Sequence, residues 1–261
     1  MNHDFIVGNS ALIISIPHAG TGLAENMQKR LGEPAKALPD TDWHVDRLYE
    51  FAAQREISLL VARYSRYVVD LNRPADDAPL YPGAGTGLVP LETFAGEPLY
   101  RSGSEPDAVE VERRRQRYWQ PYHDALARCL EQTRNRHGYA VLLDAHSIAS
   151  RVPRLFEGRL PDLNLGSYDS RSAGPSLEQA VIDVLGGSDR FSFVHDGRFK
   201  GGHITRHYGR PADGWHALQL EIAQAAYLDE SRPQDWDPAR ARPLVDLLEQ
   251  LVDVMSQWRP A

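Results

Sequence analysis

The sequence predicts an α/β fold, and three observations support this prediction. Several short runs are almost continuous in apolar residues, which is typical of strands buried on both faces of a sheet. Longer segments carry an apolar residue every three or four positions, the period of an amphipathic helix. The two kinds of segment alternate along the chain, and this alternation is the pattern of an α/β sheet with helices packed on it.

The strands are predicted by apolar runs of five or six residues between turn-forming or polar segments. Five runs meet this description: Ala11–Ile16, Ile57–Ala62, Tyr67–Leu71, Ala140–Asp144 and Ala217–Ile222.

The helices are predicted by apolar stripes at helical spacing. Pro121 is expected to break or kink the longest of them, since proline removes a backbone donor. Gly186-Gly187 is expected to end another. The four predicted helices are Asp42–Gln54, Asp107–Asn135, Ser176–Leu185 and Pro243–Trp258.

The chain is long enough for one large domain or two small ones, because its 261 residues compare with about 150 per domain. The Pro- and Gly-rich stretch 72–98 is the best candidate for a linker, but apolar residues occur throughout it. A long ordered loop over one domain is the better interpretation. We therefore expect residues 1–261 to form a single domain.

The composition excludes several classes of protein. Apolar residues make up 42% and charged residues 25% of the chain, as in ordinary globular domains. The 29 Lys and Arg residues against 36 Asp and Glu residues give a net charge of −7, so neither nucleic acid nor an anionic membrane surface is expected as a partner. No segment approaches the roughly 18 apolar residues of a membrane span, and the N-terminal apolar run lacks the basic region of a signal peptide. The single cysteine, Cys129, allows no intrachain disulfide and favours a reducing, cytoplasmic location.

Two histidines lie at the ends of predicted strands, where ligands bind in open α/β sheets. His18 follows the first strand, and His146 follows Asp144 at the end of the fourth. Neutral imidazole is the commonest protein metal ligand, and its other ring nitrogen needs an orienting partner, for which Asp144 is a candidate. The alternative is that both are hydrogen-bonded structural histidines.

A third ligand is available from the segment around Asp42, since an open zinc site often combines two histidines with a carboxylate. Asp42 and Asp46 lie four residues apart at the start of a predicted helix, and spacing alone does not separate them. The alternative is that Thr41 or Asp42 caps this helix, and for Asp40 and Asp46 a structural role is the preferred interpretation.

Glu221 is an unusual residue for its place in the sequence. It shares one face of the strand Ala217–Ile222 with Gln219, while the other face is apolar. A carboxylate in an apolar strand is costly unless it is paired or used. Glu221 is therefore either salt-bridged to an arginine or a general base whose pKa burial raises toward neutrality.

Two polar segments with arginines predict a pocket for an anionic substrate. Asn72-Arg73 follows a predicted strand, and Thr205-Arg206 follows Gly201-Gly202. A guanidinium grips a carboxylate with two parallel hydrogen bonds, and a neighbouring amide adds orientation. The alternatives are solvated surface arginines and, for the two glycines, a simple turn.

Several stretches together resemble the N-formylglutamate amidohydrolase family. They occur in order from about residue 15 to residue 230, each weak alone but specific jointly. The stretches are SIPHAGTGL, LPDTDWHVDRLYEFA, ARYSRYVVDLNRP, GLVPLETFAGEPLYR, LLDAHSI, PDLNLGS, FKGGHITRHYGRP and HALQLEIAQAAYLDE.

This resemblance implies one α/β domain with a mixed sheet flanked by helices, like that of the zinc carboxypeptidases and related phosphorylase/hydrolase-like enzymes. It implies hydrolysis of N-formyl-L-glutamate to formate and L-glutamate in histidine degradation. It also implies one divalent metal, zinc with cobalt as the alternative, and a metal-activated water. The residue roles that the resemblance implies are metal binding by His18, Asp42 and His146, general base catalysis by Glu221, and substrate binding by Asn72, Arg73, Thr205 and Arg206.

Two residue assignments and two alternative functions stay open. Asp46 remains the alternative acidic ligand, and His203 stands where many relatives are expected to carry tyrosine, so it receives no role. The first alternative function is hydrolysis of another N-acyl acidic amino acid. The second is a non-enzymatic anion-binding α/β module. The sequence assigns neither the walls of the acyl pocket nor the oligomeric state.

Overall fold

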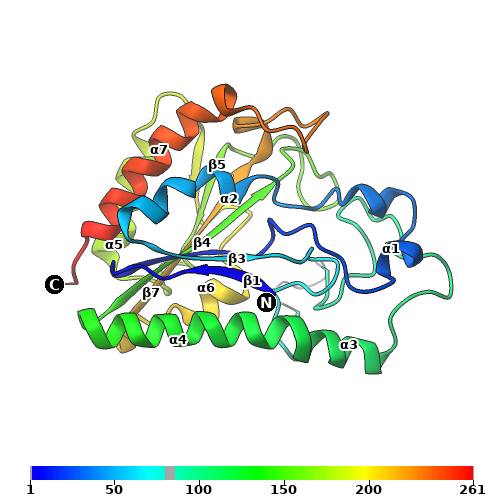
Figure 1. Ribbon diagram of the computed structural model, residues 1–261. Coiled ribbons are helices and arrows are strands. Elements are labelled where there is room, and N and C mark those ends of the chain that lie inside the picture. The colour runs from blue at the N-terminus through cyan, green and yellow to red at the C-terminus, as the bar shows by residue number, and fades with distance from the viewer. Residues whose placement is uncertain (1, 80–85, 261) are drawn as a thin grey trace.

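The protein, described here from a computed structural model covering residues 2–79 and 86–260, is built on one seven-stranded sheet (Figure 1). The strand order is β1-β3-β2-β4-β7-β5-β6. The predicted α/β class with a mixed sheet flanked by helices is confirmed. The strands are β1 (His3–Ile6), β2 (Leu12–Ile16), β3 (Ser58–Ala62), β4 (Ala140–Ile148), β5 (Leu163–Gly166), β6 (Phe193–His195) and β7 (Trp215–Ala223).

The four central strands of the sheet are parallel. Strands β3, β2, β4 and β7 run parallel to one another, whereas β1 pairs with β3 and β5 with β7 in the antiparallel sense, and β6 pairs with β5 in the parallel sense. The carboxyl ends of β2, β4 and β7 therefore meet at one edge of the sheet. This is the edge where an open α/β sheet binds its ligands.

Helices cover both faces of the sheet. In Figure 1, α3 and α4 run beneath it together with α6, and α2, α5 and α7 lie above it. The helices are α1 (Met27–Arg30), α2 (Val45–Leu48), α3 (Ala108–Arg114), α4 (Gln120–His137), α5 (Pro175–Gly186), α6 (His203–Tyr208) and α7 (Pro238–Gln257).

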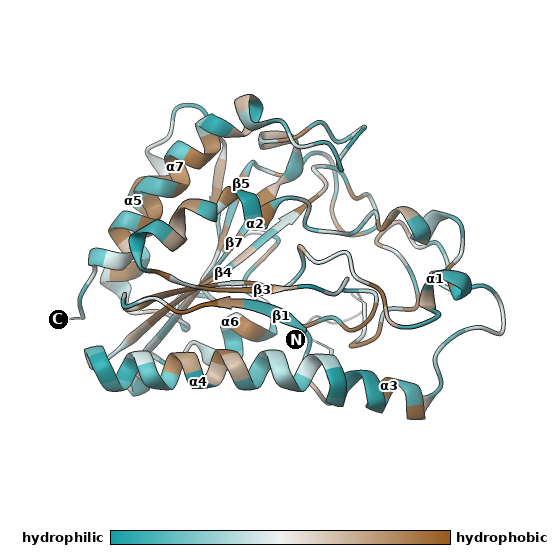
Figure 2. Ribbon diagram, in the orientation of Figure 1, coloured by the Kyte–Doolittle hydropathy of each residue, from teal (hydrophilic) through white to brown (hydrophobic). Residues whose placement is uncertain are grey.

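Alternating strand residues divide the core between these two layers. Ile14 and Leu143 belong to the apolar cluster that contains α5 and α7, whereas Ile13 and Leu142 belong to the cluster that contains α4. Both faces of the central strands are thus buried, which explains their continuous apolar runs. Figure 2 shows the apolar residues gathered on the sheet and on the helix sides that face it.

Four of the five predicted strands are confirmed, but Tyr67–Leu71 is wrong. This segment is buried and forms turns. The Arg114 guanidinium donates to the carbonyls of Tyr67 and Val68, so a side chain supplies bonds that a neighbouring strand would otherwise make. Strands β1, β5 and β6 were not predicted; they are short and lie at or next to the sheet edges.

The predicted helices are present with shifted ends. The segment predicted over Asp42–Gln54 forms only the short α2 and a 3₁₀ turn over Glu50–Arg55. The longest helix stays helical past Pro121, with a π turn over Arg115–Trp119 just before it. A π turn changes the backbone hydrogen-bond pattern just before Pro121, so the helix continues without the N–H that proline lacks. Helix α5 matches its prediction, and α7 begins five residues earlier than predicted, at Pro238.

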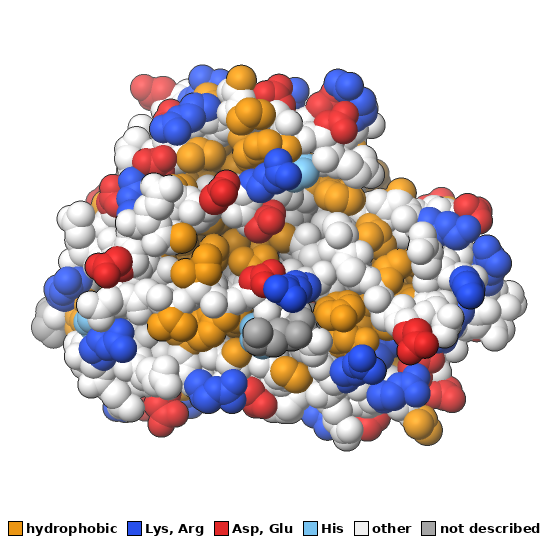
Figure 3. Space-filling model, in the orientation of Figure 1, with side chains coloured by type: hydrophobic (Ala, Val, Ile, Leu, Met, Phe, Trp, Pro, Cys, Tyr) orange, Lys and Arg blue, Asp and Glu red, His pale blue; other side chains and the backbone are white. Residues whose placement is uncertain are grey.

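The stretch 72–98 carries neither helix nor strand in its described part, and residues 80–85 of this predicted loop lie outside the described residues. Among the helices of the described ranges, none is long and apolar enough to cross a membrane. On the face drawn in Figure 3, basic and acidic side chains are interspersed.

Candidate metal centre and substrate cavity

Three parallel strands bring the predicted site residues to one edge of the sheet. His18 lies two residues after the end of β2, and His146 lies near the end of β4. Glu221 on β7 stands directly opposite His146 in the strand register. Residues more than 200 positions apart in the sequence are therefore neighbours because parallel strands end together.

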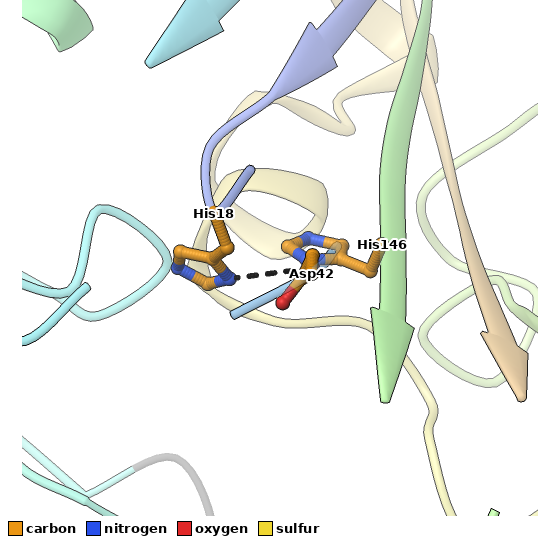
Figure 4. Close-up of side chains that lie close together, drawn as sticks. All are labelled: His18, Asp42 and His146. Carbon is orange, nitrogen blue, oxygen red and sulfur yellow. Dashed lines mark hydrogen bonds and ion pairs between the residues drawn. The ribbon is translucent and has the colours of Figure 1, made fainter. Parts of the chain in front are cut away.

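His18, Asp42 and His146 form a compact buried cluster (Figure 4). One ligand atom from each lies within 4.8 Å of the others, and the three residues are 1–2% exposed. The Asp42 carboxylate is central, because its Oδ2 lies 3.0 Å from His146 Nδ1 and 3.8 Å from His18 Nδ1.

Each histidine of the cluster contacts a second carboxylate with its other ring nitrogen. His18 Nε2 lies 2.8 Å from Asp70 Oδ1, and His146 Nε2 lies 3.1 Å from Asp144 Oδ1. Both imidazoles thus direct Nδ1 toward Asp42 while a carboxylate fixes the ring from behind. This arrangement is typical of metal-binding histidines. Asp144 was a candidate from the sequence, whereas Asp70 was missed inside an apolar run.

The structure brings Asp42, and not Asp46, into the cluster. The backbone N–H of Ser147 donates to Asp42 Oδ2, and the Asp42 N–H donates to the His18 carbonyl. Asp46 is exposed on α2. The interpretation of Asp42 as a helix cap is wrong, because α2 begins only at Val45, after His44 in a left-handed conformation, and no side chain caps it.

Arg66 is a buried cation that pairs with two carboxylates at this cluster. Its guanidinium lies 2.7 Å from Asp70 and 3.6 Å from Asp42, and it packs over the Phe94 ring. Although burial opposes ionisation, Arg66 and His18 hold the pKa of Asp70 well below its usual range. Burial, with a contribution from Arg66, lowers the pKa of His18, so this imidazole is neutral at pH 7 and its Nδ1 is available as a ligand.

The donor set and two unpaired atoms fit a divalent metal ion. His18 Nδ1 and Asp42 Oδ1 are buried without a hydrogen-bond partner, although buried polar atoms normally have one. Two imidazoles and a carboxylate are the ligands of catalytic zinc and related transition metals. The cluster could therefore hold one such ion.

Glu221 lies beside this cluster and lines a cavity. It is 8% exposed, and burial raises its pKa to about 8. Gln219 Nε2 lies 3.4 Å from its carboxylate. Among the described residues Glu221 makes no ion pair with an arginine, so the salt-bridge interpretation is not supported.

Cationic, polar and apolar side chains line the cavity. His18, His146 and Glu221 are among them. The described residues that complete its wall are Arg66, Asn72, Arg73, Thr86, Phe94, Ile148, Leu155, Arg198, Phe199, Gly202 and Gln219.

The side chain of Asn72 makes its hydrogen bonds to other groups of the protein. Its Nδ2 lies 3.0 Å from Asp144 and 2.8 Å from His146 Nε2, and its Oδ1 accepts from the Ile204 N–H. Gly202 packs against this side chain so closely that a Cβ would lie 2.5 Å from Asn72 Nδ2. Close packing explains this glycine better than a simple turn.

Thr205 and Arg206 contact Asp144 and the Gly201 carbonyl, respectively. Thr205 is fully buried, with its hydroxyl 3.4 Å from Asp144. Arg206 donates from Nε to the Gly201 carbonyl and packs over the Tyr168 ring. Neither residue is among the described residues that line the cavity. Their substrate-binding role stays a prediction.

The comparisons with known proteins identify the family. The family model of N-formylglutamate amidohydrolases matches residues 10–228. This chain belongs to the N-formylglutamate amidohydrolase family. The resemblance seen in the sequence is thereby confirmed.

Relatives in this family are similar over almost their whole length. The chain is 47% identical to N-formylglutamate deformylase of Pseudomonas putida, covering 97% of this chain and 95% of the relative. It is 48% identical to N-formylglutamate deformylase of Pseudomonas aeruginosa, covering 96% and 94%. The crystal structure of N-formylglutamate amidohydrolase from Ralstonia eutropha has a TM-score of 0.85 at 26% identity, covering 97% of each chain.

The family stretches seen in the sequence converge on the cavity, but Arg198 was not predicted as a site residue. Arg66 lies inside one of these stretches, and its ion pair with Asp42, which comes from another stretch, has no sequence signal. Arg198 lies one position before the stretch that begins at Phe199. A basic residue beside this stretch was the one available sign of its place in the wall.

Proposed function

We propose that this chain hydrolyses N-formyl-L-glutamate to formate and L-glutamate. The observation that carries the proposal is the buried His18–Asp42–His146 cluster beside Glu221, in a cavity whose wall contains arginines. The activity in the names of relatives at 47% and 48% identity supports the choice of substrate. We also propose that the reaction belongs to histidine degradation.

His18, Asp42 and His146 are the proposed ligands of one divalent ion, with zinc favoured and cobalt as the alternative. Such an ion supplies Lewis acidity, which polarises an acyl oxygen and makes a water molecule a stronger acid. The carboxylates of Asp70 and Asp144 hold the two imidazoles in their ligand orientation. Because His18 is neutral, it binds without first losing a proton.

Glu221 is the proposed general base and acid. Its pKa of about 8 in the metal-free protein results from burial. A cation in the adjacent cluster would favour the charged carboxylate and lower this pKa toward neutrality. A group with such a pKa can take a proton from the attacking water and return it to the departing amine nitrogen of glutamate.

Arg73 is the proposed partner of a substrate carboxylate. Its Nε donates to the Thr86 carbonyl and one Nη to the Asn72 carbonyl, so its fork is held at the cavity wall. Asn72 connects this arginine to His146, and it is proposed to align the bound carboxylate with the reacting group. A fixed orientation of the acyl group raises the rate without further chemistry.

Formate release from N-formyl-L-glutamate tests the proposal directly. The purified protein is assayed as prepared, after chelation, and after addition of zinc or cobalt. We expect release that disappears with the chelator and returns with metal. Release that persists after elemental analysis shows the metal gone would contradict the metal mechanism.

A substrate panel separates the proposal from hydrolysis of another N-acyl acidic amino acid. N-formyl, N-acetyl and N-succinyl glutamate are compared by kcat/KM. We expect a clear preference for the formyl compound, since only a small acyl group fits a tight acyl pocket. Faster release from either larger acyl compound would move the assignment to that substrate.

A further inference from the structure

Three arginines are among the described residues of the cavity wall, and they are not equivalent. Arg66 is buried and lies between two carboxylates, Asp70 at 2.7 Å and Asp42 at 3.6 Å, so its charge serves the cluster. Arg73 and Arg198 are the other two arginines of the described wall, and both are partly exposed. Two cations in a wall match a ligand with two carboxylates.

Arg198 is held in the wall by the loop that follows β4. Its Nε donates to the Leu155 carbonyl at 2.7 Å, which fixes the plane of the guanidinium. Leu155 and Phe199 both line the cavity and pack against the small apolar cluster that contains Ile148. Arg198 thus combines a positive charge with apolar neighbours that can cover an aliphatic chain.

The two arginines differ in their connection to the metal cluster. Arg73 directly follows Asn72, whose side chain contacts His146. Arg198 is attached instead to the loop after β4. In an N-acyl glutamate the α-carboxylate is two bonds from the amide nitrogen, and the side-chain carboxylate is four bonds from it. The carboxylate nearer the reacting group therefore matches Arg73.

We propose that Arg198, rather than Arg206, binds the side-chain carboxylate of the substrate, while Arg73 binds the α-carboxylate. This inference rests on the proposed function and names a residue that determines its specificity. Arg198 is among the described residues that line the cavity, whereas Arg206 is not. The aliphatic part of the substrate lies against Leu155 and Phe199.

The test compares substrates that differ in one carboxylate. N-formyl-L-norvaline has the same carbon chain as N-formyl-L-glutamate without the side-chain carboxylate oxygens, and N-formyl-isoglutamine lacks the α-carboxylate. For Arg198→Met we expect kcat/KM for N-formylglutamate to fall on the order of 100-fold, mainly through KM, since a charged hydrogen-bonded pair is lost. Turnover of N-formylnorvaline should change less than about threefold, because that substrate never uses the pair.

Two further variants serve as controls. Arg190→Met is the matched control, because Arg190 is exposed and packs over Phe191 as Arg198 packs over Phe199. It should leave the kinetics of both substrates unchanged. Arg198→Lys keeps the charge without the fork, and we expect it to recover about tenfold of the loss.

The outcomes separate this inference from the proposed function. Equal losses on N-formylglutamate and N-formylnorvaline in Arg198→Met would overturn it. It would also be overturned if Arg198→Met lowered kcat/KM for N-formylglutamate but not for N-formyl-isoglutamine, because Arg198 would then bind the α-carboxylate. A larger selective loss in Arg206→Met would move the assignment to Arg206. If the wild type releases no formate, the proposed function fails. The shift in Tm caused by L-glutamate relative to L-norvaline then still tests Arg198, and an equal shift in wild type and Arg198→Met would refute its role.

Discussion

Two buried histidine environments contact the same loop, residues 70–72, and they differ in their partners. His18 and His146 contact the carboxylates of Asp70, Asp144 and Asp42. His123, on α4, contacts only uncharged groups. Its Nε2 lies 2.8 Å from the Leu71 carbonyl, its Nδ1 lies 3.1 Å from the Tyr208 hydroxyl, and its ring stacks on Trp119.

The difference in partners distinguishes the candidate metal site from a histidine that supports a loop. Both ring nitrogens of His123 are satisfied, and with Trp119, whose indole N–H donates to the Arg73 carbonyl, it holds the loop that carries Asn72 and Arg73. In the cluster, by contrast, His18 Nδ1 and Asp42 Oδ1 have no hydrogen-bond partner among the described residues. Both places are buried, so unsatisfied atoms and charged partners, rather than burial, distinguish the candidate metal site.

The largest expected effect tests this distinction with two substitutions in the cluster and one at His123. His146→Ala and His18→Ala should each lose bound metal and reduce formate release to background, because a ligand is removed. His123→Gln should retain its metal, since its partners are a carbonyl and a hydroxyl. Elemental analysis and the formate assay measure both properties. Full metal content in His18→Ala or in His146→Ala would exclude that histidine as a metal ligand.

The second effect separates the proposed role of Glu221 as a general base from metal binding. Glu221→Gln keeps the size of the side chain but cannot take a proton. We expect unchanged metal content and a fall in kcat of about 10³-fold, within the usual range for a general base. Wild-type kcat in this variant would exclude Glu221 from the mechanism, and lost metal would make it a ligand instead.

The third effect concerns the carboxylates around the cluster. Asp70→Asn removes the charge behind His18, and we expect metal affinity to fall about 10- to 100-fold. Asp46→Asn is the matched control on the exposed face of α2, and it should bind metal as the wild type does. Competition with a chromophoric chelator measures both affinities, with circular dichroism as the check on folding. Weakened binding in Asp46→Asn would reopen the choice between Asp42 and Asp46.

The central fold could be predicted because the parallel strands are buried on both faces and read as apolar runs. Tyr67–Leu71 has the same composition but is no strand, since its apolarity serves packing while Arg114 binds its carbonyls. A periodic pattern does not reveal such a side-chain partner. Edge strand β1 was missed because its residues are mostly exposed and the run is only four residues long.

The candidate site was predictable where residues follow strands. His18, His146 and Glu221 meet because parallel strands end together, a rule that needs no side-chain detail. The residues from loops were harder to place. Asp70 lies within an apolar run, and Arg198 and Arg206 lie eight positions apart in one segment, yet only Arg198 reaches the described cavity wall. That choice depends on backbone contacts such as Leu155 with Arg198, which arise only in the folded chain.

The smallest expected effect uses the pH dependence of His123. Burial, with the nearby His203, lowers the pKa of His123 to about 3 in the folded protein, against 6.5 for an unperturbed histidine. Between these values the unfolded chain binds a proton that the folded protein does not, so stability falls as the pH falls from about 6.5 toward 3. At pH 5 this histidine alone should cost about 2 kcal/mol relative to pH 7.5. His123→Gln lacks this titration, so its deficit in unfolding free energy, measured with urea, should shrink by about that amount at pH 5. A deficit that is the same at both pH values would mean that His123 is protonated in the folded protein, and would place it among charged groups like those around His146.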